Sequence, residues 1–489
     1  MLTALRTPRL LVREVLAGLV VALALIPEAI SFAIIAGVDP RVGIFSSFVM
    51  AVTIAFLGGR PAMITAATGA IALVIAPVAR EHGFDYFIAT VILGGIIQLL
   101  LAALGVAKLM RFIPRSVMVG FVNSLAILIF LAQLPHLIGV PWLVYPLVAG
   151  GILIMIVMPR LTKAIPAPLI AIIVVTAITL TFALAVPNVG DQGELPRSLP
   201  ELFIPDVPLN LETLAIIAPY AFAMALVGLL ESLMTAKLVD EITDTGSPKT
   251  RESFGQGVAN VLSGLFGGMG GCAMIGQTMI NVKASGARTR ISTFLAGVFL
   301  LILVVVLGDI VGLIPMAALV AVMVMVSVAT FDWHSIRWST LKRMPKSETT
   351  VMLSTVIVVV ATNNLAVGVI VGVVVAMVAF ARRVAHFATV DRELRPDETV
   401  PTAYYTVNGE LFFASSNDLT TQFEYTDDPE RVVIDMSNSH VWDASTVAAL
   451  DAVTTKYEQQ GKRVVIEGMN EASTAMHSRL AGGFDGAAV

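Results

Sequence analysis

Apolar segments follow one another from residue 11 to residue 386 of this 489-residue chain, with only short charged connections between them. A straight helix needs about 20 apolar residues to cross the hydrocarbon core of a bilayer. The sequence predicts about fourteen segments, several of them shorter than that: 11–38, 42–58, 62–79, 84–107, 112–134, 142–158, 167–187, 212–237, 251–266, 272–283, 290–308, 310–330, 347–364 and 366–386. Only 13% of the residues are charged, whereas soluble proteins average about 25%. We therefore expect an α-helical membrane protein.

Basic residues occur in every second connection between these segments, and this alternation predicts the orientation. If the N-terminus lies inside, pairs such as Arg9 with Arg13, Lys283 with Arg288 and Arg382 with Arg383 all lie inside. We expect a multi-pass protein of the plasma membrane with both termini in the cytoplasm. The net charge of -4 is small for this length and gives no reason to expect a nucleic-acid partner.

The membrane part repeats itself at an offset of about 200 residues. FLGGRPAMI at 56–64 resembles LFGGMGGCAMI at 265–275, Ile113-Pro114 matches Ile314-Pro315, and Glu28 matches Glu231. Each copy holds about seven segments, and a repeat with an odd number of spans must be inverted in the membrane. Inverted repeats with broken helices are typical of secondary transporters, which bind substrate where the repeats meet.

Two short segments, 65–73 and 272–283, each follow a Gly-Gly pair and begin with small residues. If each is a half-helix that starts inside the membrane, its first N–H groups are unpaired and carry partial positive charge. Two such ends facing one another make an anion site without lysine or arginine. The substrate-binding candidates are Thr65, Thr68, Gly69, Cys272, Ala273, Met274, Gln277 and Thr278. The alternative is close helix packing, for which Gly, Ala and Thr are also typical.

Glu231 lies in an apolar helix, where an acid marks a functional site unless it is paired or protonated for structural reasons. Thr235, four residues on, lies on the same helical face. A carboxylate with a hydroxyl suits Na⁺, and a carboxylate alone suits H⁺; a structural pair with Lys237 is the alternative. Glu28, after Pro27, is either a second proton site or an acid near the aqueous cavity without a role. Asp240, Glu241 and Asp244 read as solvated loop charges.

From residue 391 onward the pattern is soluble α/β. YYTVNGELFFAS at 404–415 reads as a hairpin turning at Asn408-Gly409, and RVVIDM and RVVIE read as buried strands. Between these strands, Asp443 is the expected N-cap of a helix over 444–459. Beside it, Ser445 is a candidate regulatory phosphorylation site. We expect a transmembrane domain at 1–390, with repeats at about 11–187 and 212–386, and a cytoplasmic domain at 391–489.

Several motifs together resemble one family. They are Ile26-Pro27 with Gly37 and Pro40, GLLESL at 228–233, GQGVAN at 255–260, SGLFGG at 263–268, Asn281-Val282, GARTR at 286–290, GELFF at 409–413 and Asp443-Ala444-Ser445. The chain resembles a bacterial sulfate permease with a C-terminal sulfate transporter and anti-sigma antagonist (STAS) domain.

The resemblance implies a 7+7 inverted repeat with core and gate subdomains, shared with uracil permeases, an anion between the third and tenth helices, and a homodimer. It also implies that Glu231 and Thr235 form a cation-coupling pair. Many members have arginine where this chain has Gln277, and an uncharged residue where it has Glu28. Both departures favour coupling to a cation.

The leading hypothesis is therefore a secondary transporter of a small anion, of the sulfate or bicarbonate class, coupled to H⁺ or Na⁺. A C4-dicarboxylate transporter stays open. A nucleobase permease fits less well because Gln277 offers only an amide, and a STAS-based signalling protein has no need of paired broken helices. We expect no enzyme activity and no cofactor beyond a coupling ion; a cytoplasmic regulator of the STAS domain is an expected partner.

Overall fold

The computed structural model describes residues 8–108, 113–161, 166–385, 388–395, 400–416 and 419–481. The extreme ends of both predicted domains, 1–7 and 482–489, lie outside the described residues. The chain divides into two compact units, Met1–Val373 and Val374–Val489. The division falls within helix α16 (Leu365–Ala385), ahead of residue 390. The domain boundary expected near 390 stays a prediction.

Every one of the fourteen predicted apolar segments contains a helix. The first repeat comprises α2 (Pro8–Ala36), α3 (Pro40–Leu57), α4 (Gly69–His82), α5 (Phe84–Ala103), α6 (Arg115–Leu131), α7 (Val144–Leu161) and α8 (Ala167–Thr181). The second comprises α9 (Leu211–Thr243), α10 (Lys249–Leu265), α11 (Ile275–Met279) with its π-helical continuation η4 (Ile280–Ala284), α12 (Arg290–Gly312), α13 (Met316–Thr330), α15 (Lys346–Thr362) and α16. The connections hold η2 (Leu134–Leu137), η3 (Val189–Gln192) and α14 (Trp338–Arg343).

Eight helices of the described residues are long and apolar enough to cross a membrane. Helices α4 and α11 fall short because they are half-helices, and α8 and α13 have 15 residues each. Pro114 and Pro315 precede α6 and α13 directly, as the repeat predicts, because proline fits where a helix starts. One predicted boundary is wrong: Asp309 lies inside α12, which continues to Gly312.

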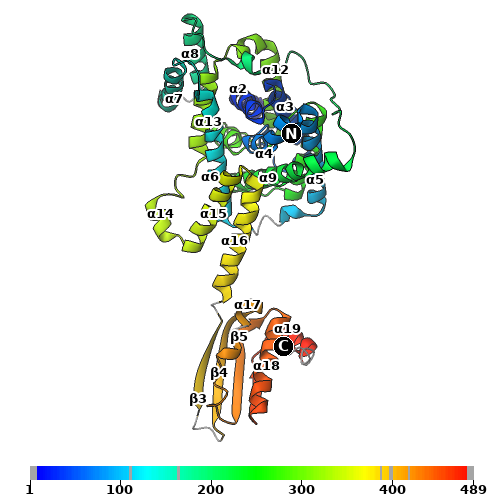
Figure 1. The fold of residues 1–489 in the computed structure, drawn as a ribbon, viewed down its shortest axis with the longest axis vertical. Helices are drawn as coiled ribbons and strands as arrows, with labels where there is room; N and C mark the ends of the chain where they lie inside the picture. Colours follow the sequence, from blue (N-terminus) through cyan, green and yellow to red (C-terminus); the bar gives the residue numbers. More distant parts are fainter. Residues whose placement is uncertain are drawn as a thin grey trace. The chain divides into compact units, whose positions relative to one another are not determined.

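The helices form two packing groups. In one, α2 packs on α12 and α3, and α5 packs on α10 and α9. In the other, α6 packs on α15 and α13, and α7 packs on α13 and α8. Figure 1 shows α7, α8 and α13 on one side of the helical part and α2 to α5 with α9 on the other. The helices of each group come from both repeats, which is the expected core and gate arrangement.

The second unit contains a four-stranded sheet ordered β3-β4-β5-β6. Its strands are β3 (Thr389–Arg395), β4 (Thr402–Leu411), β5 (Arg431–Val441) and β6 (Arg463–Glu467); its helical segments are α17 (Phe413–Ser416), η5 (Leu419–Thr421), α18 (Ala444–Gln459) and α19 (Glu471–Leu480). β3 and β4 are antiparallel, whereas β4, β5 and β6 run parallel. The α/β class is as expected.

The hairpin expected at Asn408-Gly409 is wrong. These two residues lie inside β4, at an irregularity where the register against β5 shifts between Thr406 and Asn408. Gly409 has a φ of 104°, so the dipeptide marks an irregular strand position that needs glycine. The antiparallel partner of β4 is β3, which precedes it in the chain.

Candidate functional site

The two half-helices begin at a crossing of two short extended segments, β1 (Thr65–Ala66) and β2 (Cys272–Ala273). The segments pair antiparallel, with Thr65 opposite Ala273 and Ala66 opposite Cys272. Helix α4 then starts at Gly69 and α11 at Ile275. The backbone is therefore non-helical within two apolar segments, as the broken-helix prediction requires. Such backbone is tolerated at membrane depth only inside protein or along a cavity.

Gly271 is required by this crossing. A Cβ atom there would lie 1.9 Å from the carbonyl oxygen of Ala66. Any side chain would push the two segments apart, so glycine is fixed here by close backbone approach.

Two buried asparagines hold the crossing from either side. Asn260 of α10 accepts a hydrogen bond from Gly271 N (2.8 Å) and donates to Gln98 Oε1 (2.8 Å). Asn281 of η4 donates to the carbonyl oxygen of Ala62 (2.8 Å), whose φ of 61° is unusual for a residue with a side chain. Buried backbone groups need such partners. The site residues predicted from the sequence did not include these two asparagines. The signal that could have revealed them is an amide side chain within an otherwise apolar segment.

Glu231 of α9 faces the crossing and is only 7% exposed. Its Oε2 atom lies 2.9 Å from Cys272 Sγ, and Thr68 Oγ1 lies 3.1 Å from the same sulfur. A chain of three side chains therefore joins the start of α4 to the carboxylate. The Thr235 hydroxyl donates to the backbone oxygen of Glu231 (2.8 Å) and lies 3.4 Å from Ala273 O. Lys237 is exposed, so the described contacts give no support to a structural Glu231–Lys237 pair.

Glu28 of α2 meets the other half-helix. Gln277 Nε2 donates to Glu28 Oε1 over 2.6 Å. Gln277 is 3% exposed and its Oε1 atom has no hydrogen-bond partner among the described residues. Beside it, Gly276 is exposed, and a Cβ atom there would meet nothing within 4 Å. Open space therefore adjoins the first turn of α11.

The remaining predicted donors already have partners in the protein. Thr65 Oγ1 accepts from Gln256 Nε2 (3.1 Å), and Thr278 Oγ1 accepts from Ile64 N (3.0 Å). A Cβ atom on Gly69 would lie 2.8 Å from the Phe32 ring, so that ring covers the first turn of α4. Ala273 and Met274 lie buried at the crossing. The structure brings the predicted residues together, and their roles toward an anion stay predictions.

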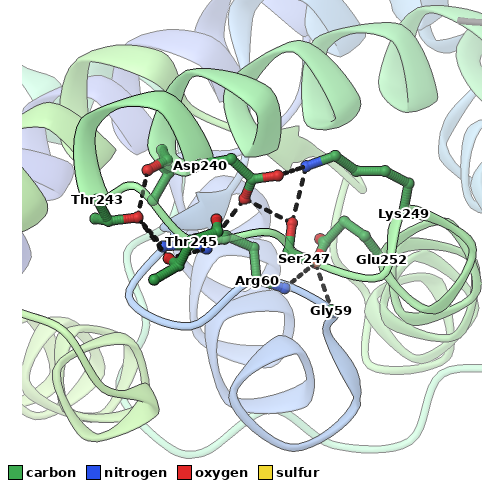
Figure 2. A network of polar contacts seen from close by, with 9 residues as sticks. Gly59, Arg60, Asp240, Thr243, Thr245, Ser247, Lys249 and Glu252 are labelled. Carbon is green, nitrogen blue, oxygen red and sulfur yellow. Dashed lines mark hydrogen bonds and ion pairs between the residues drawn. The ribbon is translucent and has the colours of Figure 1, made fainter.

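A polar network joins the ends of α3, α9 and α10 (Figure 2). Asp240 Oδ1 accepts from Arg60 Nη1 (3.0 Å), and Asp240 Oδ2 from Lys249 Nζ (2.5 Å). Glu252 Oε2 accepts from the backbone N–H groups of Gly59 (2.7 Å) and Arg60 (2.9 Å).

The interpretation of Asp240 as a solvated loop charge is therefore wrong. Helix α9 continues beyond its apolar part to Thr243 and ends at Asp244 in the left-handed conformation. Glu241 also lies within this last turn of α9. The network fixes the connection from α3 to β1 against the α9–α10 turn.

In the second unit, Asp443 caps α18 as expected, accepting from Thr446 N over 3.0 Å. Ser445 follows it and is exposed, so its hydroxyl is accessible for modification.

Comparison with known proteins agrees with this architecture. The model of the sulfate permease family matches residues 11–147 and 142–355, and the model of the STAS domain matches residues 394–482. YbaR of Bacillus subtilis, provisionally named a sulfate transporter, is 53% identical over 469 residues, which cover 96% of this chain and 97% of that protein. The bicarbonate transporter BicA of Picosynechococcus is 26% identical, over 66% of this chain and 62% of BicA.

Solved structures agree on the fold. Murine Slc26a9, an anion transporter in its inward-facing state, superposes with a TM-score of 0.81 at 17% identity, over 97% of this chain and 88% of that one. The transmembrane domain of a cyanobacterial BicA gives 0.65 at 24% identity, over 75% of this chain and 97% of that domain.

Proposed function

Because the chain belongs to the sulfate permease family, we propose that it is a secondary active transporter of a small anion of the sulfate or bicarbonate class in the plasma membrane. The names of YbaR and BicA supply these two substrates. The observation that carries the proposal is the antiparallel crossing of β1 and β2, from which two half-helices start in opposite directions.

The crossing supplies an anion site by simple electrostatics. The first N–H groups of each helix have no partner within the helix, and the helix dipole adds partial positive charge. Open space beside Gly276 gives a small anion access to the start of α11. No arginine or lysine occupies β1, β2 or the first turns of α4 and α11. The proposed substrate residues are the predicted ones.

Coupling to a cation follows from charge. Glu28 and Glu231 place two carboxylates beside these helix starts. An anion binding there is repelled unless at least one carboxylate is neutralised. Glu231 with Thr235 and the backbone oxygen of Ala273 is the proposed cation-coupling site, for H⁺ or Na⁺. The cation and the anion would then move together.

The other parts of the proposal concern assembly and regulation. The transmembrane domain ends before β3, and both termini are cytoplasmic. The protein is a homodimer, and a cytoplasmic regulator acts on its STAS domain at the exposed Ser445. Since β3 starts at Thr389, a truncation should end before that residue. It should change rate or assembly and leave the order of preferred anions unchanged.

Uptake into proteoliposomes tests the function. Purified protein is reconstituted, and labelled sulfate, bicarbonate and fumarate are offered with imposed Na⁺ or pH gradients. We expect accumulation of sulfate or bicarbonate against its gradient, and its loss in Glu231→Gln protein that still inserts and folds. Uptake of fumarate alone would favour the dicarboxylate alternative, and gradient-driven accumulation by Glu231→Gln would remove Glu231 from the coupling.

A further inference from the structure

The pairing of Glu28 with Gln277 leaves an unusual group in the site. A glutamine amide has two N–H donors and an acceptor oxygen, and which end points where is assigned from its partners. An ionised carboxylate only accepts, so it must face the amide nitrogen. The structure shows this arrangement, with Gln277 Nε2 on Glu28 Oε1 at 2.6 Å. It leaves Gln277 Oε1 buried and without a partner among the described residues.

An unpartnered oxygen next to the start of α11 is the wrong group for an anion. Its lone pairs repel negative charge, while the donors of the same amide are turned to Glu28. Buried polar atoms without partners are rare in native proteins, and each needs an explanation. One proton bound to Glu28 would give this oxygen a hydrogen-bond partner and would free the amide donors for the anion.

We infer that Glu28 and the Gln277 amide form a proton-operated switch that turns the amide donors toward the anion, an inference that rests on the proposed function. When Glu28 takes up a proton from water, its O–H group becomes a donor. The amide then rotates by half a turn, so that Gln277 Oε1 accepts from Glu28 and Nε2 takes the place of the unpartnered oxygen. A proton and an anion thus bind together, and on release the proton returns from Glu28 to water.

Access and surroundings fit this switch. Glu28 is partly exposed although it lies in the middle of the α2 sequence, and Gly276 beside Gln277 is exposed. Neither Glu28 nor the start of α11 is therefore enclosed in the packed core. Gln277 is the single hydrogen-bond partner of Glu28 among the described contacts. Exchange of one proton on Glu28 is therefore enough to reverse this contact.

The elements packed against α2 carry their charges at their ends. The elements are α3, α4, α8, α11, η4, α12 and α13. Their titratable or charged residues are Arg41 on α3, Arg80, Glu81 and His82 on α4, Lys283 on η4, and Arg290 and Asp309 on α12. All of them lie within the last or first turns of their elements, and α8, α11 and α13 have none. Glu231 approaches the crossing from α9 and is bonded to Cys272 instead.

The test measures how anion affinity depends on pH in full-length protein in proteoliposomes. The probes are labelled sulfate and labelled bicarbonate, with the concentration of the bicarbonate ion itself held constant at each pH. If one proton must bind with the anion, the apparent affinity rises as pH falls, by up to about tenfold per pH unit above the titration range. In Glu28→Gln, the new amide replaces the protonated acid, so the slope should lose the contribution of one proton, about tenfold per pH unit. Glu81→Gln, the same change at an exposed glutamate of α4, should keep the wild-type slope.

Size-exclusion chromatography in detergent shows whether Glu28→Gln folds. If it does not fold, a second variant tests the switch. Gln277→Met keeps the length of the side chain and removes both donor and acceptor. It should weaken anion affinity at every pH and lower the slope, leaving only the pH dependence that repulsion by the Glu28 charge produces. A wild-type slope in Glu28→Gln or in Gln277→Met, or a pH-independent wild type that still transports, would overturn the switch alone. A wild type that moves neither anion would overturn the proposed function, and the switch with it.

Discussion

Gly271→Ala should break the crossing from which both half-helices start. The new methyl group would lie 1.9 Å from Ala66 O, 2.6 Å from Ala66 C and 3.0 Å from Ala67 Cα. Carbon and oxygen atoms approach comfortably only to about 3.3–3.6 Å, so β1 and β2 must separate by more than about 1 Å. Overpacking of this kind costs about 1–3 kcal/mol.

The separation also strains the Asn260 hydrogen bonds to Gly271 N (2.8 Å) and Gly271 O (3.1 Å). Each buried hydrogen bond contributes about 0.5–1.5 kcal/mol net. The total loss in unfolding free energy is about 2–6 kcal/mol. The matched control is Gly276→Ala on α11, where the methyl group meets nothing within 4 Å. There the change should stay below about 1 kcal/mol and favour the folded state, because alanine is the better helix former.

Cys272 supplies the assay for this pair of variants. It is the only cysteine of the chain and is fully buried next to Gly271. A dye that reacts with exposed thiols therefore reports opening of the crossing as detergent-solubilised protein is heated. Labelling should begin at a clearly lower temperature in Gly271→Ala and at the wild-type temperature or above in Gly276→Ala. Equal onset temperatures in all three proteins would refute the close packing on which the reasoning depends.

Three further predictions concern single groups. Cys272→Ser should retain uptake because a hydroxyl still donates to Glu231, whereas Cys272→Ala should lower uptake by about tenfold, equivalent to about 1.4 kcal/mol. Equal uptake by both variants would contradict a role for the hydrogen bond from residue 272 to Glu231. Asp428, 5% exposed, accepts hydrogen bonds from the buried hydroxyls of Tyr405 (2.6 Å) and Tyr457 (2.5 Å). Asp428→Ala should cost the small domain about 2–6 kcal/mol, because two buried hydroxyls lose their acceptor; chemical denaturation followed by tryptophan fluorescence measures this, and an unchanged midpoint would count against it. Burial raises the pKa of Tyr425 from 10.0 to about 12, so the stability that this group contributes is present below pH 10 and is lost as pH rises toward 12. Tyr425→Phe should reduce this loss of stability at alkaline pH in the same denaturation assay, and an unchanged pH dependence would show that Tyr425 does not cause it.

Much of the membrane fold follows from the sequence because its signals are local. The lengths of the apolar runs predicted the membrane segments, and the prolines at 114 and 315 predicted where two helices start. The glycine pairs before residues 65 and 272 gave the broken helices, since a helix cannot continue easily through them. Errors arose where a helix carries charge, as at Asp240 in α9 and Asp309 in α12. A polar residue ends an apolar run without ending the helix.

In the small domain the error has another cause. Asn-Gly is the strongest short signal for a hairpin turn, yet in this chain it lies within β4. The parallel neighbour β5 pairs with both residues of the dipeptide after the register shift at Val407, and the antiparallel neighbour β3 pairs as far as Asn408. Tertiary pairing on both sides of the strand therefore outweighs the local turn preference, which a single sequence does not reveal.

The pairing within the site depends on contacts between the repeats. The glutamates at 28 and 231 were recognised as candidates from their apolar surroundings, but their partners were not. Glu28 of the first repeat meets Gln277 of the second, 249 residues away in sequence, and Glu231 of the second repeat reaches Thr68 of the first through Cys272. Each carboxylate is thus linked by hydrogen bonds to a side chain at the half-helix of the opposite repeat. Because the two repeats must cross for this to happen, the same geometry that forms the proposed anion site also brings both acids to it, and neither repeat alone would contain the complete proposed site.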